Sequence, residues 1–448
     1  MSGLEIGFIS LALMLVLIWI GMHVGVALTL LSFVGVGLIR DNFEVAGRML
    51  ALSVYESINS HLFGVVPLFV LMGLLISVSD VGKETFLVAE RVFRRVKGGL
   101  GVATVAANAI FAAVTGISIA SAAVFTRVAV PEMLKLGFTP RFATGVVAGS
   151  SVLGMLIPPS LLLIVYAFLA EQSVGSLFLA GIIPGLVLAL AFSLGIIFVA
   201  HRFPGLVFDG RNEILDQKGS EAAERETQLN DLTGLDMVKM IFPIVALVGL
   251  VFGGIYGGFF TPTEAGAVGA LGALVIALAK RKLDWKGLWR VLEETGHITV
   301  SISFLIIAAS IYTRMLAMSG VPQFLVGGLD GLDLGFAGFV ALYVIIILIM
   351  GTILDSTSIL LIVCPLTLPI AATFGVDLIW WGIITVLAVE IGLITPPLGI
   401  SVYVIKSTLN DRRISLSDIF LGAAPFALVM LLVLILLIIF PWMSTALV

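Results

Sequence analysis

The sequence has few charged residues and almost no cysteine. Asp, Glu, Lys and Arg make up 12% of the 448 residues, against about 25% in soluble domains. The single cysteine, Cys364, excludes an internal disulfide and a cysteine metal cluster. The phosphate-binding pattern GxxxxGK[ST] and the hydrolase patterns HExxH and GxSxG are also missing. The chain therefore has no nucleotide-hydrolysing loop of that kind, and no motif predicts a catalytic or cofactor-binding residue or enzyme activity.

Long apolar runs are what the sequence has instead. Hydrophobic residues account for 60% of the chain, and no basic block predicts nucleic-acid binding. A membrane-spanning helix needs about 20 apolar residues. Several runs qualify, near 5–22, 24–40, 62–80, 142–170, 177–200, 240–257, 263–280, 297–316, 378–405 and 416–441. The sequence therefore predicts an all-α polytopic membrane protein.

Two further apolar runs, 100–133 and 334–372, are interrupted near the middle by small and polar residues. Each predicts a re-entrant hairpin, which goes partway into the membrane and returns to the same side. Two of the spanning runs also contain a Pro-Pro pair, which removes backbone donors and breaks the helix. In lipid, such a break is tolerated only where it is buried in protein or lines a polar cavity.

The two halves of the chain repeat these features at one offset of 238 residues, without gaps. The matched residues are a turn serine, a proline 13 residues later, a glycine and the Pro-Pro pair. They pair Ser118 with Ser356, Pro131 with Pro369, Gly154 with Gly392, Pro158 with Pro396, and Pro159 with Pro397. Corresponding breaks in two halves of a polytopic protein are typical of the binding site of a secondary transporter.

The distribution of Lys and Arg predicts the topology. If both hairpins are non-crossing, nearly all basic loops fall on one face, which is then cytoplasmic. Both termini then lie outside, and the repeats are inverted. We expect scaffold helices in 1–61, followed by a first repeat in 62–201 with its cytoplasmic-side hairpin at about 100–133 and its broken helix at 142–170. A cytoplasmic linker at 202–239 then leads to the scaffold helices of the second half in 240–295. The second repeat, in 296–448, has its periplasmic-side hairpin at about 334–372 and its broken helix at 378–405.

The hairpin turns carry neutral oxygen ligands. Hydroxyls and free carbonyls lie at the first turn, 114–123, and at the second, 351–358. Hard monovalent cations bind such oxygens, and the C-terminal ends of broken helices supply more of them. We therefore predict two Na+ sites, one between the first turn and Ser150–Gly154, and one between the second turn and Ile391–Thr395. The N-termini at the same breaks would face an anionic substrate.

Asp355 and Glu390 lie within the second repeat's apolar runs. A carboxylate at membrane depth costs roughly 2.5 kcal/mol or more and is a functional candidate by default. Either residue is a candidate to bind Na+ or carry a proton. For Glu390 the alternative is a pairing inside the helix bundle.

Four stretches resemble the DctM-type large membrane subunit of TRAP (tripartite ATP-independent periplasmic) transporters. They are VTGISIASAAVFTRVAVPEMLKLGFTPRFATG at 114–145, SSVLGMLIPPSLLLIVYAFLAEQSVGSLFLAGIIPG at 150–185, GGFFTPTEAGAVGA at 257–270 and GLITPPLGISVYV at 392–404. GTILDSTSILLIVCPLTLPIA at 351–371 is similar to that family's second hairpin. The TPTEAGA and Pro-Pro stretches are the most specific, and the resemblance runs from about residue 5 to 440.

The resemblance implies a Na+-driven elevator-type importer of organic acids in a bacterial inner membrane. Its partners would be a small four-helix membrane subunit and a periplasmic substrate-binding protein. The implied cation-site residues are Thr115, Gly116, Ser118, Ser150, Ser151, Gly154, Asp355, Ser356, Thr357, Gly392 and Thr395. The candidate contacts to the carboxylate substrate are Ser121, Pro158, Pro159, Ser358, Pro396 and Pro397. Many members carry an acidic residue in the first turn, where this chain has none.

Two other readings remain at the level of sequence. A stand-alone sodium/dicarboxylate symporter shares the plan of hairpins and breaks but needs no binding protein. A non-transporting membrane scaffold or enzyme is the second, and it predicts no stabilisation by sodium. The TPTEAG stretch and the lack of Ser-Asn-Thr at the hairpin turns favour the TRAP reading over the stand-alone symporter.

Overall fold

The computed structural model describes residues 1–209, 231–331 and 335–448. The regular secondary structure of these residues is helical, apart from one isolated β-bridge between Phe138 and Phe208. The N-terminal part forms α1 (Gly3–Trp19), α2 (Val24–Ile39), α3 (Phe43–Asn59), a short 3-10 helix (His61–Gly64), α4 (Val65–Ser77) and α5 (Val81–Phe93). The first repeat follows with α6 (Gly99–Thr115), α7 (Ser118–Lys135), α8 (Pro140–Ser151), α9 (Leu153–Leu156), α10 (Leu161–Leu169), α11 (Val174–Arg202) and α12 (Pro204–Val207).

The second half has the same plan. Its helices are α14 (Gly234–Tyr256), α15 (Pro262–Ala279), α16 (Trp285–Ser319), α17 (Val321–Gly331), α18 (Gly335–Gly351), α19 (Ser356–Thr373), α20 (Leu378–Leu393), α21 (Ile400–Leu409), α22 (Leu416–Ile439) and α23 (Trp442–Thr445). Within the described residues, six helices are long and apolar enough to cross a membrane, or up to eight if two bent pairs each count as one span. The prediction of an all-α polytopic membrane protein is confirmed.

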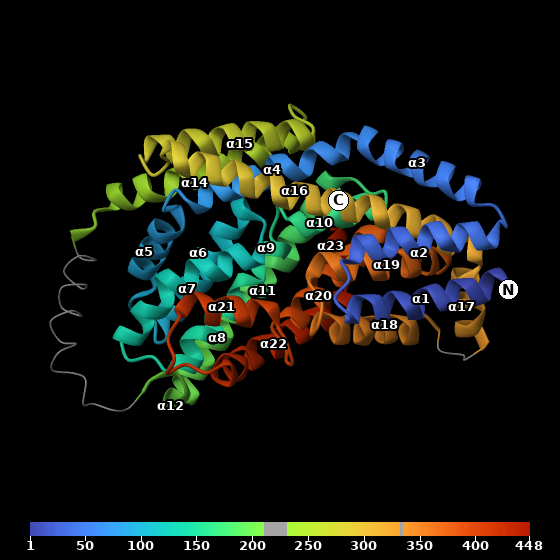
Figure 1. Cartoon of the computed structure of the whole chain (residues 1–448). Coiled ribbons are helices and arrows are strands. Elements are labelled where there is room, and N and C mark those ends of the chain that lie inside the picture. The colour runs from blue at the N-terminus through green and yellow to red at the C-terminus, as the bar shows by residue number, and fades with distance from the viewer. Residues whose placement is uncertain (210–230, 332–334) are drawn as a thin grey trace.

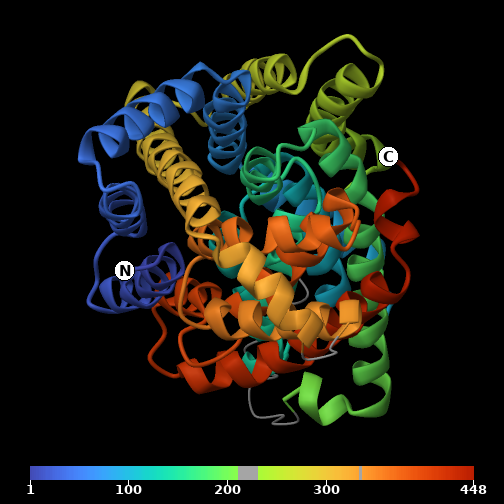
Figure 2. The ribbon, with the colours of Figure 1, turned by 90° about the vertical axis from the view of Figure 1, so that its right-hand side faces the viewer.

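One group of helices lies at the edge of the molecule. In the end-on view, yellow α14 and α15 and blue α1–α3 follow the rim, and the orange α18–α19 pair crosses the middle (Figure 2). Helix α4 packs against α15 and α16, and small residues let it approach closely. A Cβ on Gly269 would lie 2.5 Å from the Met72 sulfur. This group surrounds the two repeats on one side.

The TPTEAGA stretch has a local structural role at the start of α15. The Thr261 amide donates to Glu264 Oε2 at 2.8 Å, and the Glu264 amide donates to Thr261 Oγ1 at 3.3 Å. Pro262 occupies the first helical turn, where its missing N–H costs no hydrogen bond within the helix. The motif is therefore a capping box that fixes where this helix begins.

Each predicted hairpin is a pair of helices joined by a tight turn. Helices α6 and α7 form the first pair, and α18 and α19 the second. Figure 1 shows the cyan pair on the left of the molecule and the orange pair on the right, so the two approach the centre from opposite ends. The helix bounds lie close to the predicted 100–133 and 334–372. Their re-entry into a membrane remains a prediction.

Both helices that the sequence predicts to be broken are interrupted in the structure. Helix α8 with α9 is bent by 43° relative to α10 at the first Pro-Pro pair, and α20 ends just before the second. Both pairs, Pro158-Pro159 and Pro396-Pro397, have a cis peptide bond. Most of the predicted linker at 202–239 lies outside the described residues, and its described ends belong to α11, α12 and α14.

The two repeats interlock. Helix α7 packs against α21, and its counterpart α19 packs against α10, so each hairpin contacts the broken helix of the other repeat. Helix α8 also packs against α22 through glycines, because a Cβ on Gly422 would lie 1.9 Å from the Arg141 carbonyl oxygen. Arg141 Nε donates to Asp418 at 2.8 Å across the same contact. The repeats therefore form one packed body.

A sharp joint connects α4 to α5, which are bent by 62°. Asp80 lies at the joint with φ of 60° and pairs with Lys282 at 2.7 Å, and Glu84 pairs with Lys280. The charge and hydrogen bond of Asp80 raise the pKa of Lys282. These pairs tie the joint to the loop between α15 and α16. That loop leads into a single helix, α16, which begins at Trp285, ahead of the predicted span at 297–316, and runs through it.

Substituting Gly422 by alanine should destabilise the protein by about 1–3 kcal/mol, because the added methyl group overlaps the Arg141 carbonyl oxygen. Thermal unfolding of the purified protein in detergent measures the effect. Gly249→Ala in α14 is the matched control, since a Cβ there meets nothing within 4 Å. Equal unfolding temperatures for the two variants would contradict the close packing of α8 on α22.

Candidate functional site

The first turn lies directly against the first helix break. A Cβ on Gly154 would lie 3.1 Å from the Ser118 nitrogen, so the residue matched by the repeat is a glycine at a close backbone approach. Gly116 has φ of +63°, and a Cβ there would meet the Pro159 carbonyl oxygen at 2.3 Å. The Leu161 amide donates to the Gly116 carbonyl at 3.1 Å. The turn and the break thus satisfy each other's backbone groups.

The second turn and break have the same relation. A Cβ on Gly392 would lie 2.5 Å from the Gly351 Cα, so the end of α18 touches the end of α20. The Leu398 amide, just after the Pro-Pro pair, donates to the Thr352 carbonyl at 3.1 Å. The structure therefore brings together the two groups of residues predicted for each site.

Several predicted ligand hydroxyls already donate to carbonyls of their own helix. Thr115 Oγ1 donates to Phe111, Ser151 Oγ to Ala148, and Thr395 Oγ1 to Ile391, at 3.0, 2.9 and 2.6 Å. Such bonds are a common use of hydroxyls in apolar helices. They leave the oxygen lone pairs free, but by themselves they do not distinguish a cation ligand from a packing residue.

Asn108, in the first hairpin, is a polar residue that the sequence patterns did not predict as part of a site. Its amide nitrogen donates to Ser150 Oγ at 2.7 Å, and its Oδ1 is buried without a hydrogen-bond partner. Ser118 and Ser121 are fully buried, and their hydroxyls lack hydrogen-bond partners among the described residues. The only signal for Asn108 in the sequence was its position about two helical turns before the hairpin tip.

Asp355 is the N-cap of α19 and is exposed. Its Oδ1 accepts from the Thr357 and Ser358 amides at 3.1 and 3.0 Å, and the Ser358 hydroxyl also contacts the carboxylate. The side chain therefore fixes the start of the helix. Asp355 is held beside the second turn, although it is not the buried charge that its place in an apolar run suggested.

Glu390 is the carboxylate that is fully buried. Its Oε1 accepts from Ser356 Oγ at 3.1 Å, and its Oε2 has no hydrogen-bond partner. Ser118, from the first hairpin, lies beside the same carboxyl group, but its hydroxyl does not complete a hydrogen bond. The first turn has no acid of its own, but a carboxylate from the second repeat lies beside it.

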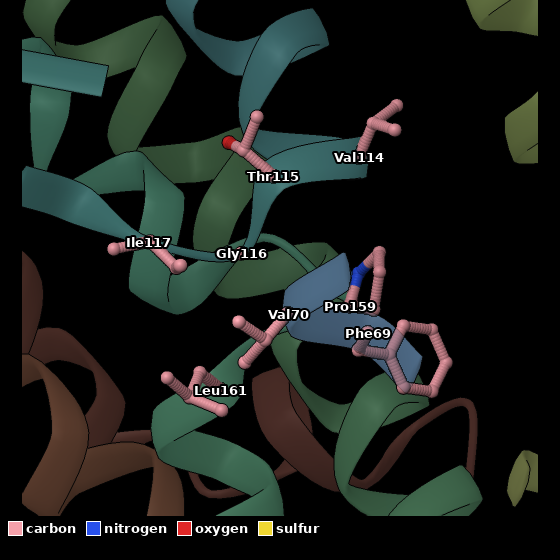
Figure 3. Close-up of a pocket in the computed structure, with 8 residues that line it drawn as sticks. All are labelled: Phe69, Val70, Val114, Thr115, Gly116, Ile117, Pro159 and Leu161. Carbon is pink, nitrogen blue, oxygen red and sulfur yellow. The ribbon is translucent and has the colours of Figure 1, made fainter. Parts of the chain in front are cut away.

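The two breaks differ in exposure. Pro158 and Pro159 are buried, whereas Pro396 and Pro397 are exposed. Figure 3 shows why: the first turn and Pro159 meet α4 at a narrow crevice. The crevice is lined by Phe69, Val70, Val114, Thr115, Gly116, Ile117, Pro159 and Leu161, and it is too narrow for a water molecule.

The helix ends at each break determine what could bind there. Helices α6 and α9 end near the first break, and α18 and α20 end near the second. Their last carbonyls carry partial negative charge, which favours a cation. The N-termini of α7 and α19 lie beside Glu390 and Asp355, so protein carboxylates already face those positive ends.

Comparison with known proteins identifies the family. Residues 11–443 match the model of the tripartite ATP-independent periplasmic transporter, DctM component. The chain belongs to this family. It is 32% identical over 403 residues to the C4-dicarboxylate TRAP transporter large permease protein DctM of Pseudomonas aeruginosa, with 89% of each chain covered. It is 28% identical to the sialic acid TRAP transporter large permease protein SiaM of Vibrio cholerae, covering 95% of this chain and 94% of that one.

The fold also resembles a solved transporter. The crystal structure of the Alcanivorax borkumensis YdaH transporter matches with a TM-score of 0.55 at 13% identity, covering 89% of this chain and 90% of that one. The DctM-family assignment confirms the predicted resemblance and makes the chain a transport protein rather than an enzyme. The predicted cation and substrate residues remain predictions.

Gly392→Ala should speed hydrogen exchange at the Leu398 amide, because the methyl group pushes α18 away and weakens the bond to Thr352. Exchange of a peptide covering Thr395 to Gly399, followed by mass spectrometry, measures this. Gly296→Ala in α16, where a Cβ meets nothing within 4 Å, is the control. Unchanged exchange in Gly392→Ala would mean that this contact does not hold the second turn.

Proposed function

We propose that this chain is the large permease subunit of a Na+-coupled, binding-protein-dependent importer of an organic acid, working by an elevator mechanism. The observation that carries the proposal is the pairing of each hairpin turn with a helix break of its own repeat, at Gly154 and at Gly392. Corresponding broken helices near a repeat interface are where secondary transporters bind substrate and ions.

The ends of the paired helices support a cation at each break. At the second break the backbones of Gly351 and Gly392 are in contact, so the C-terminal ends of α18 and α20 converge. The site that we infer there adds Asp355, Ser356, Thr357 and Thr395. At the first break the corresponding residues are Thr115, Gly116, Ser118, Ser150 and Ser151. These oxygens suit a hard monovalent cation better than a transition metal, which prefers nitrogen or sulfur.

The difference between the two breaks supports alternating access. In the conformation described, α4 lies against Pro159 at the first break, while the second Pro-Pro pair is exposed. In an inverted repeat, moving the hairpins and broken helices as one body past α4 would exchange these two environments. The interlocked packing of α7 on α21 and of α19 on α10 suits such a rigid movement.

The partners and substrate follow from the family. We infer a small four-helix membrane subunit, a periplasmic binding protein, a bacterial inner-membrane location and both termini on the periplasmic side. The relatives named for C4-dicarboxylates and sialic acid make a carboxylate the favoured substrate. The substrate would contact the residues at the two breaks, Ser121, Pro158, Pro159, Ser358, Pro396 and Pro397, although the buried Ser121 would need a movement of its hairpin to be reached.

Asp355→Asn should weaken the apparent affinity for Na+ about tenfold, which corresponds to ~1.4 kcal/mol. Asparagine is an equally good N-cap, so the helix start should survive the change. Sodium titration of substrate uptake into proteoliposomes containing both membrane subunits and the binding protein measures the effect. An unchanged sodium midpoint would remove Asp355 from the cation site.

Uptake should require the cognate periplasmic protein. Proteoliposomes holding both membrane subunits and a sodium gradient should take up the carboxylate only when the binding protein is added outside. Adding that protein after heat denaturation is the control. Robust uptake without the binding protein would favour the stand-alone symporter instead.

A further inference from the structure

Glu390 joins three helices at the centre of the molecule. It lies on α20, accepts a hydrogen bond from Ser356 at the start of α19, and faces Ser118 at the start of α7. All three side chains are at least nine-tenths buried. Glu390 Oε2 and the Ser118 hydroxyl have no hydrogen-bond partners.

The internal repeat places this carboxylate between equivalent residues. Ser118 and Ser356 correspond at the offset of 238 residues, so the same serine of both hairpins meets one acid. The first-repeat counterpart of Glu390 is Val152, which is also fully buried. The two repeats therefore contribute equivalent serines but only one carboxylate to the interface between them.

The described structure supplies no cationic partner for Glu390. None of its ion pairs includes this residue. The charged side chains on helices packed against α20 have other partners. Lys406 donates hydrogen bonds to the carbonyls of Asp411 and Ile414, and Asp418 forms an ion pair with Arg141. His201 and Arg202 stand at the far end of α11, and Asp355 and Asp377 cap α19 and α20.

The remaining titratable side chains on those helices are neutral groups. Tyr166 bonds to the Leu378 carbonyl and Tyr343 to Thr385, five residues or about 7.5 Å along α20 from Glu390. Cys364 interacts with these two tyrosines, and Tyr403 is exposed. A buried carboxylate with only hydroxyl neighbours is strongly disfavoured in its ionised form. The N-termini of α7 and α19 offset only a small part of that cost.

We propose that Glu390, together with Ser118 and Ser356 from the two break sites, forms a third Na+ site, where one Na+ bound to the carboxylate joins the two hairpin turns. Unlike the two sites at the breaks, it is shared between the repeats. Because each hairpin also packs on the broken helix of the other repeat, occupancy of this site would control both turns together. This inference rests on the proposed ion-coupled transport.

The test is thermal unfolding of the purified full-length chain in choline chloride and in increasing sodium chloride at one fixed pH. Sodium should raise the unfolding temperature of the wild type, because a cation that binds the folded protein and not the unfolded chain stabilises the folded state.

Glu390→Gln keeps the size of the side chain and removes its charge. This variant should lose at least half of the sodium-dependent rise in unfolding temperature, whereas Asp377→Asn, at the exposed cap of the same helix, should behave as the wild type. Equal sodium responses in Glu390→Gln and the wild type would overturn the proposal. If Glu390→Gln does not fold, Glu390→Asp, which draws the carboxylate back by one methylene, must weaken the sodium response, and an unchanged response overturns the proposal equally.

Failure of the proposed sites at the breaks would look different. In that case Asp355→Asn would leave the sodium response unchanged while the Glu390-dependent response persists. If only the proposal at Glu390 is wrong, Asp355→Asn still weakens the response to sodium and Glu390→Gln does not alter it.

Discussion

The structure depends on satisfying backbone groups that Pro-Pro pairs release in an apolar setting. Each pair ends a helix within an apolar run of the chain, where a lost backbone hydrogen bond is costly to leave unsatisfied. The hairpin turns supply the replacements. Gly116 and Thr352 accept amides from Leu161 and Leu398, which follow the two pairs. Glycine at 154 and 392 allows the backbones to come that close. The proposed ion sites and the satisfaction of these backbone groups therefore use the same contacts.

The same contacts give the two repeats equal geometry but unequal environments. Helix α4 covers the first break, and the second is open. Glu390 breaks the symmetry in a second way, because its counterpart is Val152. Repeats that were identical in chemistry would place either two charges or none at their interface. In the site that we propose at Glu390, the single charge would allow one ion to act on both hairpins.

Much of the site could be predicted because its residues leave local signals. Pro-Pro pairs, hydroxyl-rich turns and glycines mark the breaks within otherwise uniform apolar runs, and a fixed offset pairs them. The roles of the two acids could not be ranked from sequence. Asp355 and Glu390 both lie in apolar runs. Asp355 turned out to be an exposed N-cap, and Glu390 a buried residue, because burial depends on which helix packs against which.

The sequence by itself determined the helical membrane class, the repeat and the bounds of both hairpins, because hydrophobicity and proline act locally along the chain. Only the tertiary structure decided that Ser118 and Ser356 meet at Glu390, that Asn108 reaches Ser150, and that α4 closes one break and leaves the other open. These contacts join residues from separate helices. No local pattern in the chain encodes which faces of those helices come together.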